Sequence, residues 1–211
     1  MFSIETKKSR YVAVECLCDF LECAVHAFLR SRNIYPKESF GTHMRFGLTV
    51  QLCNVKRVRQ YIKQICHSLQ TLILYDRVNA LIVATNQERF VVEVPCDFSK
   101  SVFNISEGQK SDLDVRCACT KIFHDTLIHI YRKLDHMREG LASDMEWEVT
   151  ADVKRNQSQT SELMDMPSGW LMDNRNRSNC KTRLPLKSST QEDTTFISVY
   201  LDSKEESVVT L

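Results

Sequence analysis

The chain has 211 residues, a formal net charge of +1 at pH 7 and 26% charged residues. A net charge this small excludes a nucleic-acid binder that works through whole-molecule charge alone. The length suits one domain with a tail, and a hydrophobic fraction of 43% is enough for a buried core. No apolar run approaches the ~20 residues of a membrane span. Acidic residues interrupt the apolar N-terminal segment, so we expect an intracellular protein without a signal peptide.

The first predicted element is an amphipathic helix, which is followed by an alternating strand. One face of the helix is marked by apolar residues three and four apart: Leu17, Phe20, Leu21, Ala24, Val25 and Phe28. Pro36 ends this helix, because a proline moves the residue before it out of the helical region. Residues 46–52 then alternate between apolar and polar side chains, which predicts a half-buried strand.

The later elements follow from helical spacing and from strand composition. They are helices at 55–75 and 112–139 and strands at 78–85, 89–98, 145–153 and 195–202. Residues 154–193 are polar, and a structureless stretch this long inside a compact domain is either functional or disordered. The strand that follows indicates that this stretch leaves the sheet and returns to it. The order of elements predicts an α+β fold.

Nine cysteines are present, but their spacing forms no metal or disulfide motif. The two Cys-x-Cys pairs, at 16–18 and 117–119, lie in helical patterns, where residues two apart point in different directions. Cys23 and His26 are three apart, but no second pair completes a tetrahedral set of ligands. We therefore expect free thiols that act as small core hydrophobes, and no metal ion.

Catalytic motifs are also missing from the sequence. The five glycines are too far apart for a phosphate-cradling loop, and neither a His-Glu-x-x-His nor a Gly-x-Ser-x-Gly motif occurs. His124 and His129 are five apart and do not share one face of their helix. The sequence therefore indicates a protein without enzymatic activity and without a cofactor.

The run VECLCDFLECAVHAFLRSRNIYP, with FGLTVQL after it, resembles the opening helix and turn of the HORMA-domain family. Within this family the likeness is greatest to the non-catalytic accessory subunit of translesion DNA polymerase zeta. It is carried by DFLE at 19–22, by Trp170 and its neighbours, and by RLPLK at 183–187. The resemblance implies a HORMA fold, in which an antiparallel sheet packs on three helices.

The resemblance also implies a division of the chain. An N-terminal tail (1–10) precedes the HORMA domain (11–202), and a C-terminal tail (203–211) follows it. Within the domain, 11–153 is the core and 154–202 is the safety belt, a segment that wraps over a bound peptide and adds strands to the sheet. Enclosure of this kind implies slow dissociation of the peptide.

Site residues are implied in the same way. Those matching peptide contacts of the family are Tyr61, Trp147, Trp170 and Met172. Those matching a second partner surface are Arg183, Ser198 and Tyr200, although the family has an apolar residue in place of Arg183 and an amide in place of Ser198. Lys121 matches a basic contact used for self-association.

The partners implied by the resemblance begin with a proline-containing peptide of the polymerase's catalytic subunit. A second implied partner is the C-terminal domain of the translesion deoxycytidyl transferase. The others are a HORMA-remodelling AAA+ ATPase and a second HORMA protomer, in a homodimer or heterodimer. The implied role is an adaptor in DNA damage tolerance and repair, located in the nucleus and also in the cytoplasm.

Two alternatives stay open. A spindle-assembly-checkpoint HORMA protein shares the IYP turn and would bind mitotic regulators. A protein of another class, a direct nucleic-acid binder, would use the basic stretch 175–187, which has no aromatic side chains for base stacking.

Overall fold

The computed structural model describes residues 4–96, 98, 111–136, 145–154, 170, 182–187 and 197–203. Its helices are α1 (Ile4–Ser31), α2 (Lys56–Ser68), α3 (Gln70–Leu74) and α5 (Asp112–His136), with a 3-10 helix at Lys37–Ser39. A separate hairpin consists of β1 (Phe40–Arg45) and β2 (Leu48–Cys53). The main sheet consists of β3 (Val78–Thr85), β4 (Glu88–Glu93), β5 (Trp147–Val153), β6 (Thr182–Lys187) and β7 (Val199–Ser203). Its order is β5-β3-β4-β7-β6, and every pairing is antiparallel.

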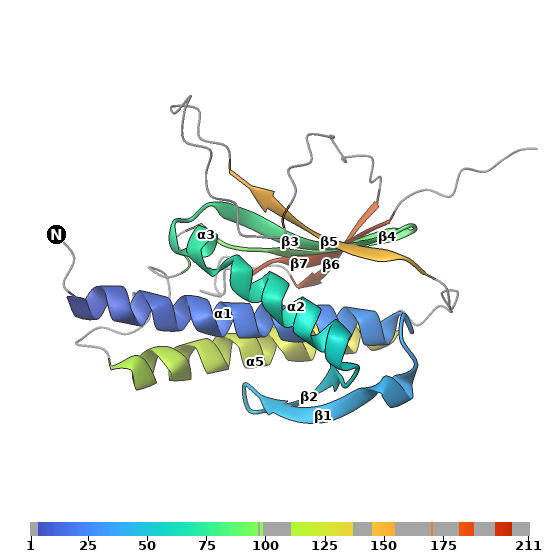
Figure 1. Ribbon diagram of the computed structural model, residues 1–211, viewed down its shortest axis with the longest axis horizontal. Coiled ribbons are helices and arrows are strands. Elements are labelled where there is room, and N and C mark those ends of the chain that lie inside the picture. Colours follow the sequence, from blue (N-terminus) through green and yellow to red (C-terminus); the bar gives the residue numbers. More distant parts are fainter. Residues whose placement is uncertain are drawn as a thin grey trace, which may run out of the picture.

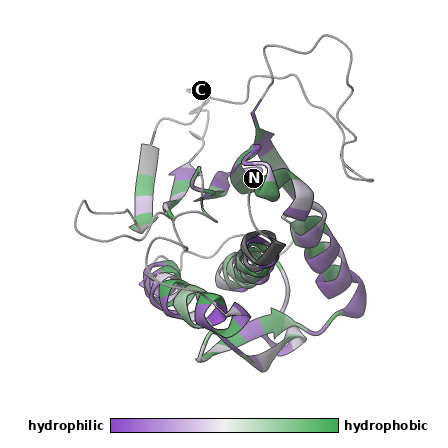
Figure 2. Ribbon diagram, turned by 90° about the vertical axis from the view of Figure 1, so that its left-hand side faces the viewer, coloured by the Kyte–Doolittle hydropathy of each residue, from purple (hydrophilic) through white to green (hydrophobic). Residues whose placement is uncertain are grey.

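Helix α1 lies in the middle of the molecule, with the sheet on one side and the hairpin on the other (Figure 1). It contacts α2, α3, α5 and β2, and the end-on view shows it surrounded by these elements (Figure 2). Phe28 of α1 stacks on Phe90 of β4, with 5.0 Å between the ring centroids. The sequence predicts one apolar face, but residues 21–29 are all buried. The reason is that neighbouring elements cover almost the whole circumference of α1.

Polar side chains at the centre of this core have partners from other elements. Arg32, which follows α1, forms a buried ion pair with Glu88 at the start of β4. Its guanidinium also lies 5.8 Å from the centroid of the Phe28 ring. Nδ1 of His26 accepts a hydrogen bond of 3.3 Å from the backbone N–H of Cys53 in β2. These contacts fix α1 to both the sheet and the hairpin.

The turn of the first hairpin replaces the start of the predicted strand at 46–52. Phe46 and Gly47 form a two-residue turn in which both φ angles are positive, 50° and 69°, as in the tight turns that suit the twist of a hairpin. Phe46 is held there because its ring packs edge-on against Phe123, 5.2 Å between centroids. Its carbonyl also lies 3.0 Å from Nδ1 of His124. Strand β1, before this turn, was not predicted.

Other elements depart from prediction at their ends. Helix α1 begins at Ile4, so it extends into the predicted tail 1–10. The predicted helix 55–75 is divided at Leu69, which ends α2 and precedes α3. Strand β4 ends at Glu93, before Pro95, a residue that cannot donate to a sheet.

Strand β6 lies inside the stretch 154–193, which we predicted to be a loop. Because its backbone partner is β7, its formation depends on residues that follow it in the chain. In the described ranges, no helix has the length and apolar character needed to cross a membrane.

Burial should make the stability of this core depend on pH through His26. Burial, together with Arg59 and His43, lowers the pKa of His26 to about 4, whereas an unfolded chain titrates histidine near ~6.5. Between these values the unfolded state binds more protons, so the stability is fully present above pH ~6.5 and is lost as the pH falls towards 4. We expect a loss of about 3 kcal/mol in the free energy of unfolding.

The measurement is urea unfolding at pH 7 and at pH 4.5. His26→Gln, which keeps an acceptor for the Cys53 N–H, should flatten the pH dependence. His129→Gln, at an exposed position on α5, should leave it unchanged. An equally steep pH dependence in His26→Gln would contradict the assignment.

Candidate functional site

The two edges of the main sheet are joined by the segment predicted to be the safety belt. Strand β5 is one edge and β6 is the other. Val153 at the end of β5 pairs with Val78, and Val199 at the start of β7 pairs with Val92. Both therefore lie at the same end of the sheet but on opposite sides of the β3–β4 hairpin. The chain therefore leaves the sheet at β5 on one side of this hairpin and rejoins it at β6 and β7 on the other, which agrees with a stretch that leaves the sheet and returns.

Trp170 lies against α2 on the way across. Its indole N–H donates a hydrogen bond of 2.7 Å to Oγ of Ser68, the last residue of α2. Its ring is half-buried and packs against the hydrophobic core. The resemblance implies a peptide contact for Trp170, but part of its surface is already covered by this chain. A contact between Trp170 and a bound peptide stays a prediction.

An aromatic cluster stands at the start of the edge strand β5. The indole N–H of Trp147 donates to the hydroxyl of Tyr35 at 3.2 Å, and the two rings lie edge-on with 6.4 Å between centroids. Tyr61 of α2 lies edge-on to the other side of the indole at 5.8 Å. Its side chain is 46% exposed, and burial of the remainder, followed by Glu148 and Tyr35, raises the pKa of Tyr61. The cluster thus presents one accessible aromatic surface beside a free strand edge.

The structure therefore brings together two of the residues predicted to contact a peptide, Tyr61 and Trp147. Tyr35 belongs with them but was not predicted as a site residue, although it is the tyrosine of the IYP turn. Its contact with the Trp147 ring depends on the fold, and no local pattern signals it. Met172 lies outside the described residues.

The second predicted surface lies at the other edge of the sheet. Tyr200 packs on Ala80, Ile82 and Val91, a small apolar cluster separate from the main core. Phe90, next to Val91, points into the main core, so alternation along β4 places Tyr200 on the sheet face away from the helices.

Ser198 and Arg183 occupy the same edge of the sheet as Tyr200. The carbonyl of Ser198 accepts a hydrogen bond from the N–H of Glu93 at 2.9 Å. Arg183 is in β6, opposite Asp202 of β7. Arg183 and Tyr200 thus lie on neighbouring strands, with Ser198 just before β7, and the use of these positions by a partner stays a prediction. Of the basic stretch 175–187, only 182–187 is described, and it forms β6.

Lys121 lies on α5 and is exposed. It borders a shallow surface hollow beside the first hairpin, together with Phe46 and His124. The opposite side of α5 packs on α1, where Phe123 stacks on Phe20 with 4.7 Å between centroids. A role for Lys121 in self-association is therefore sterically open and stays a prediction.

Eight of the cysteines are described, and all are free thiols. Six are buried, and two, Cys96 and Cys117, are exposed. Burial raises the pKa of Cys18 and of Cys23 to about 12, so these side chains remain neutral. The buried thiols act as the small core hydrophobes that the sequence predicts.

Comparison with known proteins adds sequence relatives over part of the chain. No protein-family model matches it. It is 32% identical over 97 residues to the mitotic spindle assembly checkpoint protein MAD2B of Danio rerio, which covers 46% of this chain and 43% of that protein. MAD2B of Homo sapiens is 30% identical over 89 residues, 39% of this chain and 42% of that protein. The chain thus matches less than half the length of these curated relatives.

Solved structures align with a larger share of this chain than the sequence relatives do. A chain in the crystal structure of the mitotic checkpoint complex aligns with a TM-score of 0.64 and 18% identity, over 92% of this chain and 99% of that chain. HTP-2 of C. elegans, bound to a HIM-3 closure motif, aligns with a TM-score of 0.60 and 9% identity, over 89% and 88%. The fold shared with these proteins is the HORMA fold. This chain has the HORMA fold. The predicted α+β HORMA architecture is confirmed.

Docking of the HORMA safety belt on α2 can be tested through the bond between Trp170 and Ser68. Trp170→Phe removes the N–H donor and keeps an aromatic ring, and Ser68→Ala removes the acceptor. We expect a coupling energy of ~1 kcal/mol in a double-mutant cycle measured by urea unfolding. Ser68 Oγ also donates to the Ile65 carbonyl, but this second bond is lost in both backgrounds and cancels. Strictly additive effects would contradict the contact.

Proposed function

We propose that this chain is a non-catalytic adaptor that clamps a peptide of another protein between β5 and the safety belt. The observation that carries the proposal is the outer edge of β5, which has no strand paired to it among the described residues. It lies beside Tyr61 and Trp147, and β5 is the strand from which the proposed belt departs. A peptide added to this edge gains backbone hydrogen bonds, and its side chains gain apolar contacts. The titles of two HTP-2 structures name a bound closure motif, which supports peptide binding by this fold.

Closure of the belt would determine how fast the peptide dissociates from such a complex. Once β7 has paired with β4 and β6, the proposed belt is attached to the sheet at both ends, through β5 before it and through β7 after it. A peptide lying beneath the belt leaves only after the belt opens, because the belt is continuous with β5 at one end and paired at the other. The proposal therefore implies a slow dissociation rate rather than a large contact area.

For the client, we propose a proline-containing segment of the catalytic subunit of DNA polymerase zeta, which makes this chain an accessory subunit in translesion synthesis. Support comes from the likeness to MAD2B and from the sequence runs that resemble the polymerase's accessory subunit. The second surface, around Ser198 and Tyr200, would receive the C-terminal domain of the deoxycytidyl transferase. We place the protein in the nucleus.

A spindle-checkpoint role is the second candidate. Its support is the name of the relatives, mitotic spindle assembly checkpoint protein, and the alignment with a chain of the mitotic checkpoint complex. The mechanism would be the same, with mitotic regulators in place of the polymerase peptide.

An affinity purification separates the two candidates. The tagged full chain is incubated with nuclear extract, washed at high salt, and the retained proteins are identified by mass spectrometry. A large DNA polymerase should be retained by the natural chain and lost with the double variant Tyr61→Ala/Trp147→Ala. Retention of checkpoint proteins alone would favour the second candidate and contradict the first.

The role of β7 as the closing strand gives a separate prediction. Deletion of 194–211 removes β7 with its buried Val199 and Leu201, so the belt loses its pairing with β4. The dissociation rate of a captured client should rise at least ~10-fold, while circular dichroism should still show the helices, at a lower melting temperature. Leu184→Ala, at a 42% exposed position in β6, keeps β7 and should leave the rate unchanged. An unaltered rate after the deletion would rule out closure by β7.

A further inference from the structure

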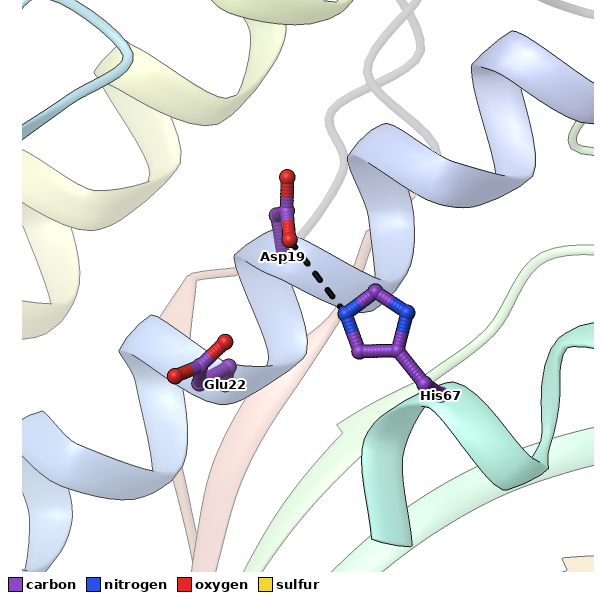
Figure 3. Close-up of side chains that lie close together, drawn as sticks. All are labelled: Asp19, Glu22 and His67. Carbon is purple, nitrogen blue, oxygen red and sulfur yellow. Dashed lines mark ion pairs between the residues drawn. The ribbon is translucent and has the colours of Figure 1, made fainter. Parts of the chain in front are cut away.

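We propose that Asp19, Glu22 and His67 form a zinc-binding site between α1 and α2. Asp19 and His67 point toward each other, and Glu22 lies one turn further along α1 (Figure 3). Each side chain offers one donor atom, and these three atoms all lie within 4.8 Å of one another. In the part of the chain that the structure describes, no other group of histidine, cysteine and acidic side chains meets this condition. The site is additional to the proposed peptide clamp.

Helix geometry explains why the three side chains meet. Residues three apart lie on the same face of a helix, so Asp19 and Glu22 share one face of α1. Helix α2 packs against α1 and brings His67, in its last turn, over that face. The ligands come from two rigid elements and not from a loop, which favours a fixed geometry.

The contact between His67 and Asp19 has the spacing of metal ligands and lacks the geometry of a hydrogen bond. Nε2 of His67 lies 3.4 Å from Oδ1 of Asp19. This nitrogen is sealed from solvent but has no hydrogen-bond partner among the described residues. Two donors bound to a tetrahedral zinc ion at 2.0–2.1 Å stand about 3.3 Å apart. A zinc ion would therefore need little movement of this pair.

The environment of Glu22 is an independent observation that points to a bound cation. Its side chain is only 5% exposed, and no residue in the described ranges donates a hydrogen bond to its carboxylate. Burial raises the pKa of Glu22, and the neighbouring Asp19 raises it further. Lys63, Arg45 and Arg59 oppose this through their charges, without contacting the carboxylate. The Glu22 and Asp19 carboxylates lie close together and repel each other, and a bound cation would offset this repulsion.

The chemistry of the set favours zinc over magnesium or calcium. Two carboxylates balance the charge of Zn²⁺, and a neutral imidazole supplies the nitrogen ligand that zinc accepts and that Mg²⁺ and Ca²⁺ rarely use. His67 also lies at the C-terminal end of α2, where the helix dipole is negative. The side chains of Asp19 and His67 are 36% and 30% exposed, so an ion can enter from solvent and a water molecule can complete the coordination.

Zinc at this position would affect the docking of the safety belt, because a zinc ligand is the direct neighbour in the chain of a residue that contacts the belt. His67 is followed by Ser68, whose hydroxyl accepts the indole N–H of Trp170. An ion that ties His67 to α1 would therefore hold the end of α2 on which the belt docks. This effect rests on the proposed clamp, whereas binding of zinc itself does not.

The test uses the full chain, stripped of metal with a chelator and kept reduced with a phosphine. Cys96→Ser and Cys117→Ser are introduced first, because these exposed thiols could bind zinc themselves. Titration with zinc chloride at pH 7, followed by calorimetry and by competition with a fluorescent zinc indicator, should give one ion per chain. Asp19→Asn, Glu22→Gln and His67→Gln should each weaken binding at least tenfold, and His129→Gln should not. Magnesium chloride should give no signal.

Three results would overturn the site. These are the absence of one-to-one binding, equal zinc affinity in the Asp19→Asn and His67→Gln proteins, and a sulfur ligand in the X-ray absorption spectrum of the zinc-loaded chain. Asp19→Asn and Glu22→Gln preserve side-chain shape, so circular dichroism should show folded proteins in which a loss of binding is informative. Because none of these measurements involves a client, failure of the zinc site would leave the clamp untouched.

Discussion

The burial of α1 on nearly all sides is the constraint on which the rest of the structure depends. A helix with one apolar face needs a single neighbour, but residues 21–29 are buried throughout and need the sheet, the other helices and the hairpin together. The polar residues within this run need specific partners, because an unsatisfied buried group is costly. The bond from Cys53 meets that need at Nδ1 of His26, and the ion pair of Arg32 with Glu88 does the same just after the helix. They also fix where the sheet and the hairpin sit.

The two edges of the sheet, which packs on α1, are formed by different parts of the chain. Strand β5 belongs to the chain before the crossing, and β6 and β7 belong to the chain after it. The β3–β4 hairpin between them is held by α1 through the stacking of Phe28 on Phe90. Trp170, from the segment that connects these two parts of the sheet, donates a hydrogen bond to Ser68 of α2. The proposed clamp needs this combination of a rigid base and an anchored segment.

The sequence predicts those parts of the fold that local patterns determine. Helix α5 and strands β3, β5 and β7 follow from apolar spacing, because each has one face toward the core. The turn at Phe46 was missed since it contains a bulky residue at positive φ, stabilised by Phe123 and His124 from a distant helix. Strand β6 was missed because it contains a proline and exists only by pairing with β7.

The candidate sites were harder to predict for the same reason. The sequence search for metal ligands examined residues close together in the chain, such as Cys23 and His26, and so it passed over Glu22 and His67. These two approach each other only when α2 packs on α1. Tyr35 was likewise recognised as part of a turn but not as a neighbour of Trp147. Tyr61 and Trp147 were predicted as peptide contacts from the family resemblance, and in the fold their rings lie side by side.

The free edge of β5 also determines which strands can join it. An unpaired edge strand can pair with the same strand of another copy and so cause aggregation. Charged side chains or a proline at the edge prevent this pairing. The β6 edge contains Pro185, which cannot donate a hydrogen bond to a further strand. The β5 edge contains no proline but has Glu148 and Asp152 on one face. A second copy of β5 paired antiparallel about Thr150 would set Glu148 against Asp152 twice, and like charges directly opposite repel. Charge repulsion therefore disfavours pairing of this edge with a second copy of β5.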